Sequence, residues 1–327
     1  MEIKSTLETI WSPSATLETI KIRAKLLASI REFFKLRNVL EVNTPILAPA
    51  TVTDPYIESL QLHSSPTGTL EGPWYLQTSP EFAMKRLLAA GSGDIYQIAP
   101  AFRCGEVGRH HNPEFTMLEW YRLGLDHHAL IDEVADLLSV LGISTTFDKI
   151  SYAQVFQDFA GIEPHDSSLQ TLRQCACDLN VGQNLLAHLT ERDQWLDLLM
   201  SEVVGPKLGL EKPVFIYDFP ATQAALAKIG SHGLAERFEL FVDGIELANG
   251  YHELTDPCEL ACRFKSDNEM RNKLGSNEVV TDVRLLAAMR SGLPQCAGVA
   301  IGFDRLLMFK AGLSAIDSAM AFNVARI

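Results

Sequence analysis

Apolar side chains in several segments of this chain recur with the period of an α-helix. They stand three or four positions apart in two long stretches and in two shorter ones, which predicts amphipathic helices there. The long stretches are residues 20–36 and 126–141; the short ones follow Ser79-Pro80-Glu81, where proline suits a first helical turn, and begin at about Asp304, behind a break at Gly302. Residues 151–212 are also helical in character, but they show no recognisable chemistry.

Other segments have the alternating or continuously apolar pattern of β-strands. They are residues 94–103, 115–121, 213–219, 238–242, 245–251 and 299–301. Two hairpins are predicted, one with its loop at residues 104–114 and one turned by Asp243-Gly244, which is a strong hairpin signal. Strands paired by hairpins, with helices between them, predict an antiparallel sheet in an α+β fold. No linker rich in Pro, Gly or Ser divides the chain, so we expect a single domain over residues 1–327.

The strand at residues 115–121 carries an unusual row of side chains. It lies within RHHNPEFTMLEWYR, where Pro113 prevents a helix. Alternation then places Phe115, Met117, Glu119 and Tyr121 on one face. An ordinary core strand would not carry a glutamate in that row, so we expect a polar ligand to lie along it.

Composition narrows the class of protein. The 327 residues include 28 Lys and Arg against 41 Asp and Glu, a net charge of -13, which argues against a broad electrostatic attraction to nucleic acid or to an anionic membrane. No apolar run reaches the ~20 residues that span a bilayer. The first residues include acidic side chains and no apolar core region, so we do not expect a secretory signal. The six cysteines form no Cys-x-x-Cys pair, which favours reduced thiols in a cytoplasmic protein. The adjacent pairs His110-His111 and His127-His128 point apart on a helix or a strand, so we do not expect them to bind a metal.

Three local patterns occur in order along the chain. They are Phe102-Arg103 followed by Arg109-His-His-Asn-Pro-Glu-Phe-Thr, then Glu246-Leu-Ala-Asn-Gly-Tyr-His-Glu253, and finally Gly298-Val-Ala-Ile-Gly-Phe-Asp-Arg305. Together they resemble motif 2, the acidic strand and motif 3 of class II aminoacyl-tRNA synthetases, and the helix before Pro45 resembles motif 1. Within that class, HNPEFTMLEWY and ELANGYHELTD resemble the catalytic domain of lysyl-tRNA synthetases in particular, and the resemblance extends from about Leu17 to residue 327. Fewer than twenty residues precede motif 1, which resembles a paralogous group of ligases without the anticodon-binding domain that attach β-lysine to elongation factor P.

The resemblance implies an ATP site. Phe115 would stack under adenine with Arg305 on the other side, and Arg103 would hold the α-phosphate. The nucleotide site would also include Cys104, Gly105, Glu106, His111, Asn112, Glu246, Leu247 and Gly302. Arg103, Arg305 and Glu246 would be catalytic, with Mg²⁺ bound by Glu246 and Glu253. Glu246 has the wrong strand parity for this site, and we expect a bulge near Gly250 to correct it.

An amino-acid pocket is expected beside the α-phosphate. The resemblance places there Ser79, Pro80, Glu81, Glu119, Tyr121, Asn249, Tyr251, Glu253 and Ala300. Three carboxylates in one pocket are costly unless cations enter, which favours a substrate with two ammonium groups, lysine or β-lysine. Motif 1 helices of this class pack across a twofold axis, which implies a homodimer; alternatively, Leu26, Ile30 and Phe33 are ordinary core residues.

Two positions depart from the pattern of these relatives. Motif 2 often reads Phe-Arg-Asn-Glu, whereas here Gly105 stands in place of the glutamate and Glu106 follows it. Ala300 stands where lysyl-tRNA synthetases usually have glycine. Two alternatives to a ligase that modifies elongation factor P remain open: a shortened synthetase that charges tRNA, and a dimeric paralogue that binds ligands without catalysis.

Overall fold

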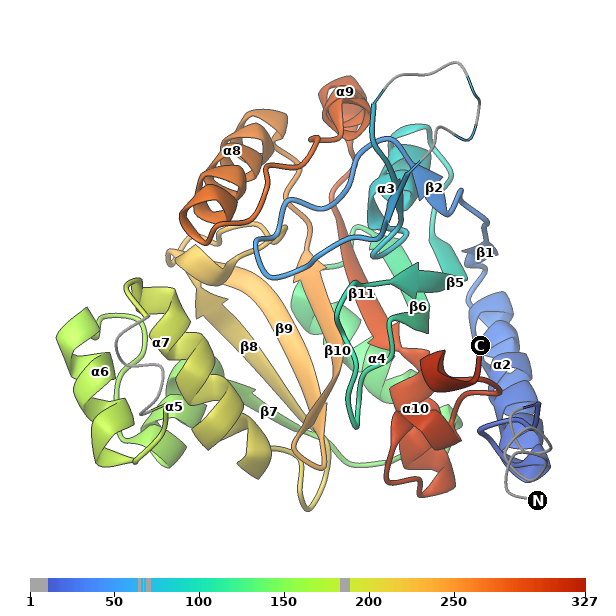
Figure 1. Cartoon of the computed structure of the whole chain (residues 1–327), viewed down its shortest axis with the longest axis horizontal. Helices are drawn as coiled ribbons and strands as arrows, with labels where there is room; N and C mark the ends of the chain where they lie inside the picture. The colour runs from blue at the N-terminus through green and yellow to red at the C-terminus, as the bar shows by residue number, and fades with distance from the viewer. Residues whose placement is uncertain (1–10, 64–65, 67, 69–71, 183–188) are drawn as a thin grey trace, which may run out of the picture.

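A large twisted sheet forms the centre of the protein, in a computed structural model that describes residues 11–63, 66, 68, 72–182 and 189–327 (Figure 1). Its eight strands are ordered β1-β5-β6-β11-β10-β9-β8-β7. Their bounds are β1 Leu40–Glu41, β5 Ile95–Phe102, β6 Glu114–Leu123, β7 Asp148–Ser151, β8 Val214–Pro220, β9 Leu234–Val242, β10 Ile245–His252 and β11 Cys296–Gly302. A small second sheet has the order β2-β4-β3, with β2 at Leu47–Ala48, β3 at Gln61–Leu62 and β4 at Trp74–Leu76.

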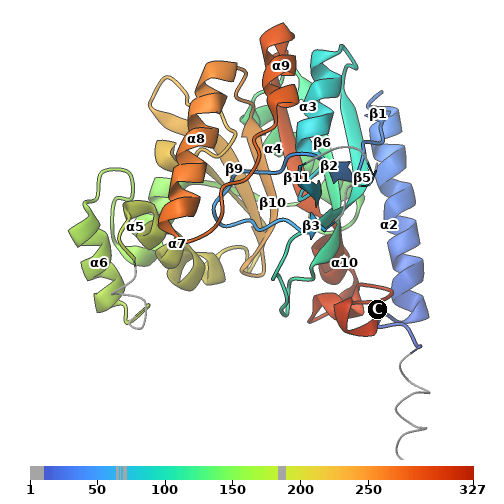
Figure 2. The ribbon, with the colours of Figure 1, turned by 45° about the horizontal axis from the view of Figure 1, so that its top comes forward.

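Helices cover both faces of the large sheet (Figures 1 and 2). On one face, α2 (Leu17–Leu36), α4 (His127–Val140) and α10 (Phe303–Ala311) contribute side chains to the largest hydrophobic cluster. On the other, α3 (Glu81–Ala89), α8 (Pro257–Lys273) and α9 (Val283–Gly292) form a second cluster around strand ends. The third cluster joins β8 to α5 (Tyr152–Ala160), α6 (Leu169–Asp178) and α7 (Arg192–Leu199), which a π-turn at Met200–Val204 and a 3₁₀ turn at Gly205–Lys207 continue. Short 3₁₀ turns at Ala221–Gln223, Ile316–Ser318 and Val324–Arg326 complete the elements.

The predicted elements are confirmed to within a few residues, but the sheet is not wholly antiparallel. The five inner strand pairs are antiparallel as expected, whereas β1 pairs with β5 and β7 pairs with β8 in parallel. The strands of each parallel pair are joined by a connection longer than a hairpin, which includes α3 between β1 and β5 and α5 to α7 between β7 and β8. The hydrophobic pattern does not show that these connections return the chain to a neighbouring strand. The antiparallel prediction is therefore wrong at both edges. None of the described helices is long and apolar enough to cross a membrane.

The predicted motif 1 helix packs inside its own chain. Leu26, Ile30 and Phe33 are buried in the largest cluster. Beside them, Asp304 at the start of α10 accepts hydrogen bonds from Arg23 Nη1 of α2 at 2.5 Å and from the backbone N–H of Thr116 at 2.6 Å. Asp304 therefore links α2, β6 and α10.

Candidate active site

The register of the inner strands brings residues distant in sequence into rows on one face of the sheet. Glu119 on β6 lies opposite Ala300 on β11, which lies opposite Asn249 on β10. In the next row, Tyr121, Gly298 and Tyr251 are aligned in the same way. This face lines a cavity of about 1300 Å³ that also reaches α3, α7 and α8. The row of unlike side chains predicted on residues 115–121 is thus the floor of a cavity.

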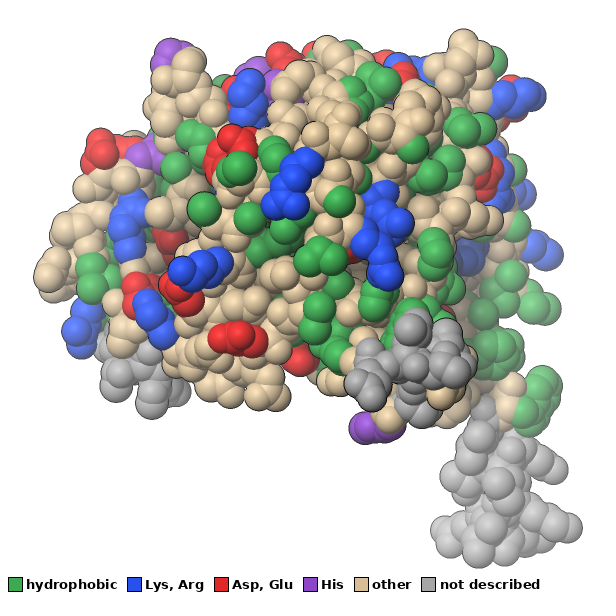
Figure 3. Space-filling view, turned by 90° about the horizontal axis from the view of Figure 1, so that it is seen from above, with side chains coloured by type: hydrophobic (Ala, Val, Ile, Leu, Met, Phe, Trp, Pro, Cys, Tyr) green, Lys and Arg blue, Asp and Glu red, His purple; other side chains and the backbone are tan. Residues whose placement is uncertain are grey.

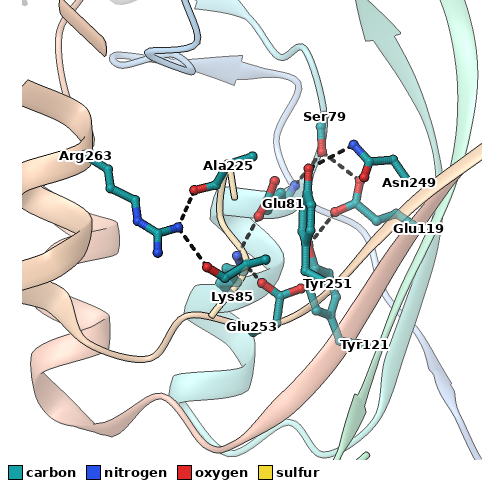
Figure 4. A network of polar contacts seen from close by, with 11 residues as sticks. Ser79, Glu81, Lys85, Glu119, Tyr121, Ala225, Asn249, Tyr251, Glu253 and Arg263 are labelled. Atoms are coloured by element: carbon teal, nitrogen blue, oxygen red, sulfur yellow. Dashed lines mark hydrogen bonds and ion pairs between the residues drawn. The ribbon is translucent and has the colours of Figure 1, made fainter. Parts of the chain in front are cut away.

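Three carboxylates meet at one end of the cavity, as predicted, but a lysine lies among them (Figure 4). Nζ of Lys85 is 2.5 Å from Oε1 of Glu81, one helical turn away on α3, and 2.5 Å from Oε2 of Glu253. Lys85 is 3% exposed. Burial alone would lower the pKa of its ammonium, but the charges of Glu253 and Glu81 outweigh burial and raise it. Lys85 is therefore a resident cation that neutralises part of the acidic pocket.

Glu119 has hydrogen bonds but no cationic partner among the described residues. Its Oε2 accepts from Ser79 Oγ at 2.7 Å and its Oε1 accepts from the Tyr121 hydroxyl at 2.6 Å. Burial and then the negative charge of Glu81 raise the pKa of Glu119 to about 7. Burial likewise raises the pKa of Glu253 to about 8, although Lys85 opposes it. A further cation, bound beside Glu119 or Glu253, would lower the pKa of that carboxyl group and favour its ionised form.

A glycine allows these groups to approach one another. A Cβ atom at Gly298 would lie 2.3 Å from Cε1 of Tyr121 and 2.5 Å from Oε1 of Glu253. No side chain fits there without moving either the tyrosine ring or the carboxylate. Gly298 lies within β11, and the sequence pattern marked it only as part of motif 3; the packing of the pocket floor requires a glycine there.

Glu246 joins the cavity through a bulge that lies earlier in β10 than expected. The register of β9 and β10 shifts between Glu246 and Ala248, so that one extra residue, Leu247, is accommodated. The bulge restores Glu246 to the face of Asn249, and both residues line the cavity. The predicted bulge near Gly250 is therefore wrong in position, while its predicted effect on the parity of Glu246 is observed.

The other end of the cavity carries two arginines and an aromatic ring. The guanidinium of Arg103 lies 5.2 Å from the ring centroid of Phe115, and its Nη1 is 3.8 Å from Oε1 of Glu106. Nε of Arg103 is buried and has no hydrogen-bond partner within the described part of the chain. Arg305 donates to the backbone carbonyls of His110 and Glu246 at 3.1 and 2.7 Å. Two forked cations beside an aromatic face can hold an anionic nucleotide.

Nearly all predicted site residues line this cavity. Cys104 and Gly105 do not, and Gly105 instead turns the motif 2 loop with a φ of 79°. Asn112 lines the cavity, but its amide is engaged: Nδ2 donates to the Glu114 carbonyl at 2.6 Å and Oδ1 accepts from the Val324 N–H at 3.0 Å.

At the rim, helices α3, α8 and α9 contribute Arg86, Arg263 and Arg284. Figure 3 shows Lys and Arg side chains among hydrophobic ones on the face above these helices.

Sequence reasoning missed a second buried network, which extends the pocket across β9. Arg237 donates to Oε1 of Glu239 at 2.5 Å and to Oδ1 of Asn249 at 3.2 Å, and Asn249 donates to the Tyr251 hydroxyl at 2.9 Å. Burial raises the pKa of Glu239 to about 7. The alternation of Arg237 and Glu239 on one face of a strand rich in apolar residues was the available signal. For Lys85 the signal was its position four residues after Glu81, on a helix whose neighbours Met84 and Leu88 are buried.

Comparison with known proteins identifies relatives over almost the whole chain. The family described as tRNA synthetases class II (D, K and N) matches residues 10–326. A protein of Vibrio vulnificus (strain YJ016) named elongation factor P--(R)-beta-lysine ligase is 49% identical over 315 residues, which cover 95% of this chain and 97% of that protein. Proteins with the same name from Vibrio cholerae and from Pseudoalteromonas translucida are each 48% identical, over 97% of this chain and 98% of their own length. The predicted family and its α+β fold are confirmed.

An adenylating site is consistent with this assignment. The class II motifs stand on adjacent strands β6, β10 and β11, with their arginines at one end of the cavity and their carboxylates at the other. The chain therefore belongs to the class II aminoacyl-tRNA synthetase family (D, K and N), and within that family to the group of elongation factor P–(R)-β-lysine ligases.

Proposed function

We propose that this protein is an ATP-dependent ligase that activates (R)-β-lysine, or lysine, as an adenylate and transfers it to a lysine ε-amine of elongation factor P. The names of relatives that are 46 to 49% identical over nearly their full length support this function. The observation that carries it for this chain is the balance of charge in the acidic pocket.

The pocket has room for two further positive charges. Glu81, Glu119 and Glu253 would carry three negative charges when ionised, and Lys85 supplies one positive charge. The excess of two negative charges matches a substrate with two ammonium groups. Buried carboxylates are costly when unpaired, so the same pocket disfavours amino acids with neutral side chains. The raised pKa values of Glu119 and Glu253 imply that binding of such a dication releases protons.

The nucleotide end of the cavity supports the activation step. An oxygen of the substrate carboxylate attacks the α-phosphorus of ATP, forming a new P–O bond while the bond to pyrophosphate breaks. Arg103, whose Nε has no partner within the described residues, would neutralise charge on the α-phosphate. Arg305 is held by two backbone carbonyls, which fixes its plane against the base. Catalysis would then depend on alignment rather than on a protein nucleophile.

We expect Mg²⁺ to bind at Glu246. This residue lines the cavity, its backbone carbonyl accepts a hydrogen bond from Arg305, and its charge contributes to the raised pKa of Glu239. Carboxylate oxygens suit Mg²⁺, which would neutralise phosphate charge. Glu253, the second ligand implied by the resemblance, is paired with Lys85 and could contribute only if that ion pair opened.

In the transfer step, the acceptor amine attacks the carbonyl carbon of the adenylate, the bond to AMP breaks, and the amine loses a proton. We expect a protein acceptor rather than tRNA, because the net charge of -13 offers no general attraction to a phosphate backbone. We also expect the enzyme in the cytoplasm, because the proposed acceptor works in translation.

We also propose a homodimer. The inward face of α2 is core, but Leu17 and Leu36 at its ends are 72% and 71% exposed, and Leu40 on the adjacent edge strand is 55% exposed. Exposed apolar side chains beside an edge strand suit a protein interface. Sedimentation at micromolar concentration tests this, and a monomer would refute it.

The decisive experiment separates activation from transfer. The enzyme is incubated with ATP, Mg²⁺ and either lysine isomer, first for pyrophosphate exchange and then with elongation factor P or tRNA(Lys). We expect exchange that depends on the lysine isomer, and a mass increase of elongation factor P by one lysyl unit without charging of tRNA. Exchange without transfer would limit the proposal to adenylation, robust charging of tRNA would replace the acceptor, and no exchange would indicate a catalytically silent paralogue. Arg103→Ala serves as the inactive control.

A further inference from the structure

A cluster of possible metal ligands lies on the reverse side of the sheet from the cavity. His127, Glu236 and His252 each offer one ligand atom, and these atoms lie within 4.8 Å of one another. Nδ1 of His252 is 2.5 Å from Oε2 of Glu236. We call these three residues the reverse-face cluster.

Strand alternation places the cluster away from the reaction. His252 stands between Tyr251 and Glu253, and Glu236 precedes Arg237; Tyr251, Glu253 and Arg237 all line the cavity. Because side chains alternate along a strand, His252 and Glu236 point to the other face. That face is covered by α4, which lies behind β10 and β11 in Figure 1 and brings His127 from its first turn. Three separate elements thus converge on one point.

A hydrogen-bonded pair of His252 and Glu236 alone does not explain the buried position of His127. Its side chain is 6% exposed, yet neither ring nitrogen has a hydrogen-bond partner within the part of the chain that the structure describes. A buried polar group left in this way destabilises the fold. Imidazole is a preferred metal ligand, and metal coordination would give one of the two ring nitrogens a partner.

A second carboxylate stands next to the cluster. Oδ1 of Asp218 is 3.8 Å from Nε2 of His127. Asp218 occupies the bulge where β8 shifts register against β9, and its φ of 61° is uncommon for a residue other than glycine.

We propose that His127, Glu236 and His252 bind a divalent first-row transition metal ion of the zinc type, with Asp218 as the fourth ligand. Two imidazoles and two carboxylates suit zinc and its neighbours better than Mg²⁺. Bonds of about 2.0–2.1 Å in a tetrahedral site place ligand atoms roughly 3.4 Å apart. The ligand atoms of the reverse-face cluster lie within 4.8 Å of one another, so side-chain movements of about 1 Å would bring them to that separation. The ion would join the N-terminus of α4 to β8, β9 and β10, and would hold the segment of β10 that carries Tyr251 and Glu253 on its other face.

The test uses the full chain after treatment with a chelator. Zinc is titrated by calorimetry in excess Mg²⁺, which occupies oxygen-rich sites in the cavity, and thermal unfolding is followed in parallel. We expect one equivalent of zinc and a rise in Tm of roughly 5 °C at saturation, because a ligand that binds only the folded state stabilises it. Glu236→Gln and His127→Ala should each weaken zinc binding at least tenfold. His232→Ala, which changes an exposed histidine, should leave it unchanged.

Thiols are the competing ligands, since Cys104, Cys258 and Cys262 are exposed. Cobalt separates the two cases: the proposal requires visible d–d bands of a nitrogen and oxygen site without thiolate-to-cobalt charge-transfer absorption. The proposal would be overturned by thiolate absorption, by zinc binding that persists in both cluster variants, or by zinc binding that is no tighter than micromolar. Glu236→Gln is the variant that keeps the test decisive if His127→Ala fails to fold.

Discussion

Replacing Glu119 by glutamine should stabilise the folded protein at alkaline pH while it removes much of the affinity for a diamino acid. The carboxylate is 2% exposed, and the ammonium of Lys85 pairs with Glu81 and Glu253 rather than with Glu119. Glutamine has the same shape, and the Tyr121 hydroxyl can still donate to its amide oxygen. The substitution therefore removes a buried charge with little change in packing.

The effect on stability follows from the pKa of Glu119, which burial raises from 4.5 to about 7. Between these values the folded protein binds a proton that the unfolded chain releases, so the stabilising contribution is complete below about pH 4.5 and is lost as pH rises through 7. At ~1.4 kcal/mol per pKa unit, the loss is on the order of 3 kcal/mol. In Glu119→Gln this part of the pH dependence should be absent, while the part that comes from Glu253 and Glu239 remains.

The effect on binding has the opposite sign. An ammonium about 4 Å from a carboxylate gains up to roughly 4 kcal/mol near a protein surface. Loss of that partner should raise KM for the lysine isomers about a hundredfold. In the unchanged enzyme, KM should also fall as pH rises from 6 to 8, because Glu119 ionises in that range, and this fall should be much reduced in the variant.

The assay is urea unfolding at 25 °C at pH 5.5 and pH 8, together with pyrophosphate exchange over the same range. Glu18→Gln is the matched control, since Glu18 is 69% exposed and pairs only loosely with Lys21 at 3.8 Å. We expect the control to change stability by less than about 0.5 kcal/mol at either pH. A Glu119→Gln protein with the same pH dependence as the parent, or with a normal KM, would refute the reasoning.

Three further substitutions test other parts of the site. Arg103→Ala should lower adenylation about a hundredfold without unfolding the protein, because it removes a cation from developing charge; near-normal pyrophosphate exchange would contradict this. Gly298→Ala should destabilise the fold by about 1–3 kcal/mol, measured by urea unfolding, because its Cβ would lie 2.3 Å from the Tyr121 ring, whereas Gly108→Ala, with nothing within 4 Å, should not. Ala300→Gly should improve kcat/KM for α-lysine relative to β-lysine by about 1–3 kcal/mol of discrimination, and an unchanged ratio would remove Ala300 from the choice of isomer.

Much of the site could be predicted because its motifs are local. Pro113 and the alternation after it determined that residues 115–121 form a strand with Glu119 and Tyr121 on one face. The Asp243-Gly244 turn determined the second hairpin. Both predictions depend on interactions within a few residues, which the sequence records directly.

Other features could not be predicted because they depend on how distant elements meet. The sequence shows Lys85 only as a charged residue on a short helix, and the packing of α3 over the sheet is what buries it beside Glu253. The reverse-face cluster was missed for the same reason: His127 and His128 point apart, but His127 meets residues of two strands more than a hundred positions away.

The sequence by itself determined the fold class, the family and the chemical types of the site residues, because periodicity and short motifs are properties of neighbouring residues. Only the tertiary structure decided which charges are paired. The pKa of Glu119, the ion pairs of Lys85 and the position of the bulge at Leu247 depend on strand register, on burial and on contacts across the sheet. Burial makes these charges costly unless another residue compensates them, and Glu253, which pairs with Lys85, lies far from it in the sequence.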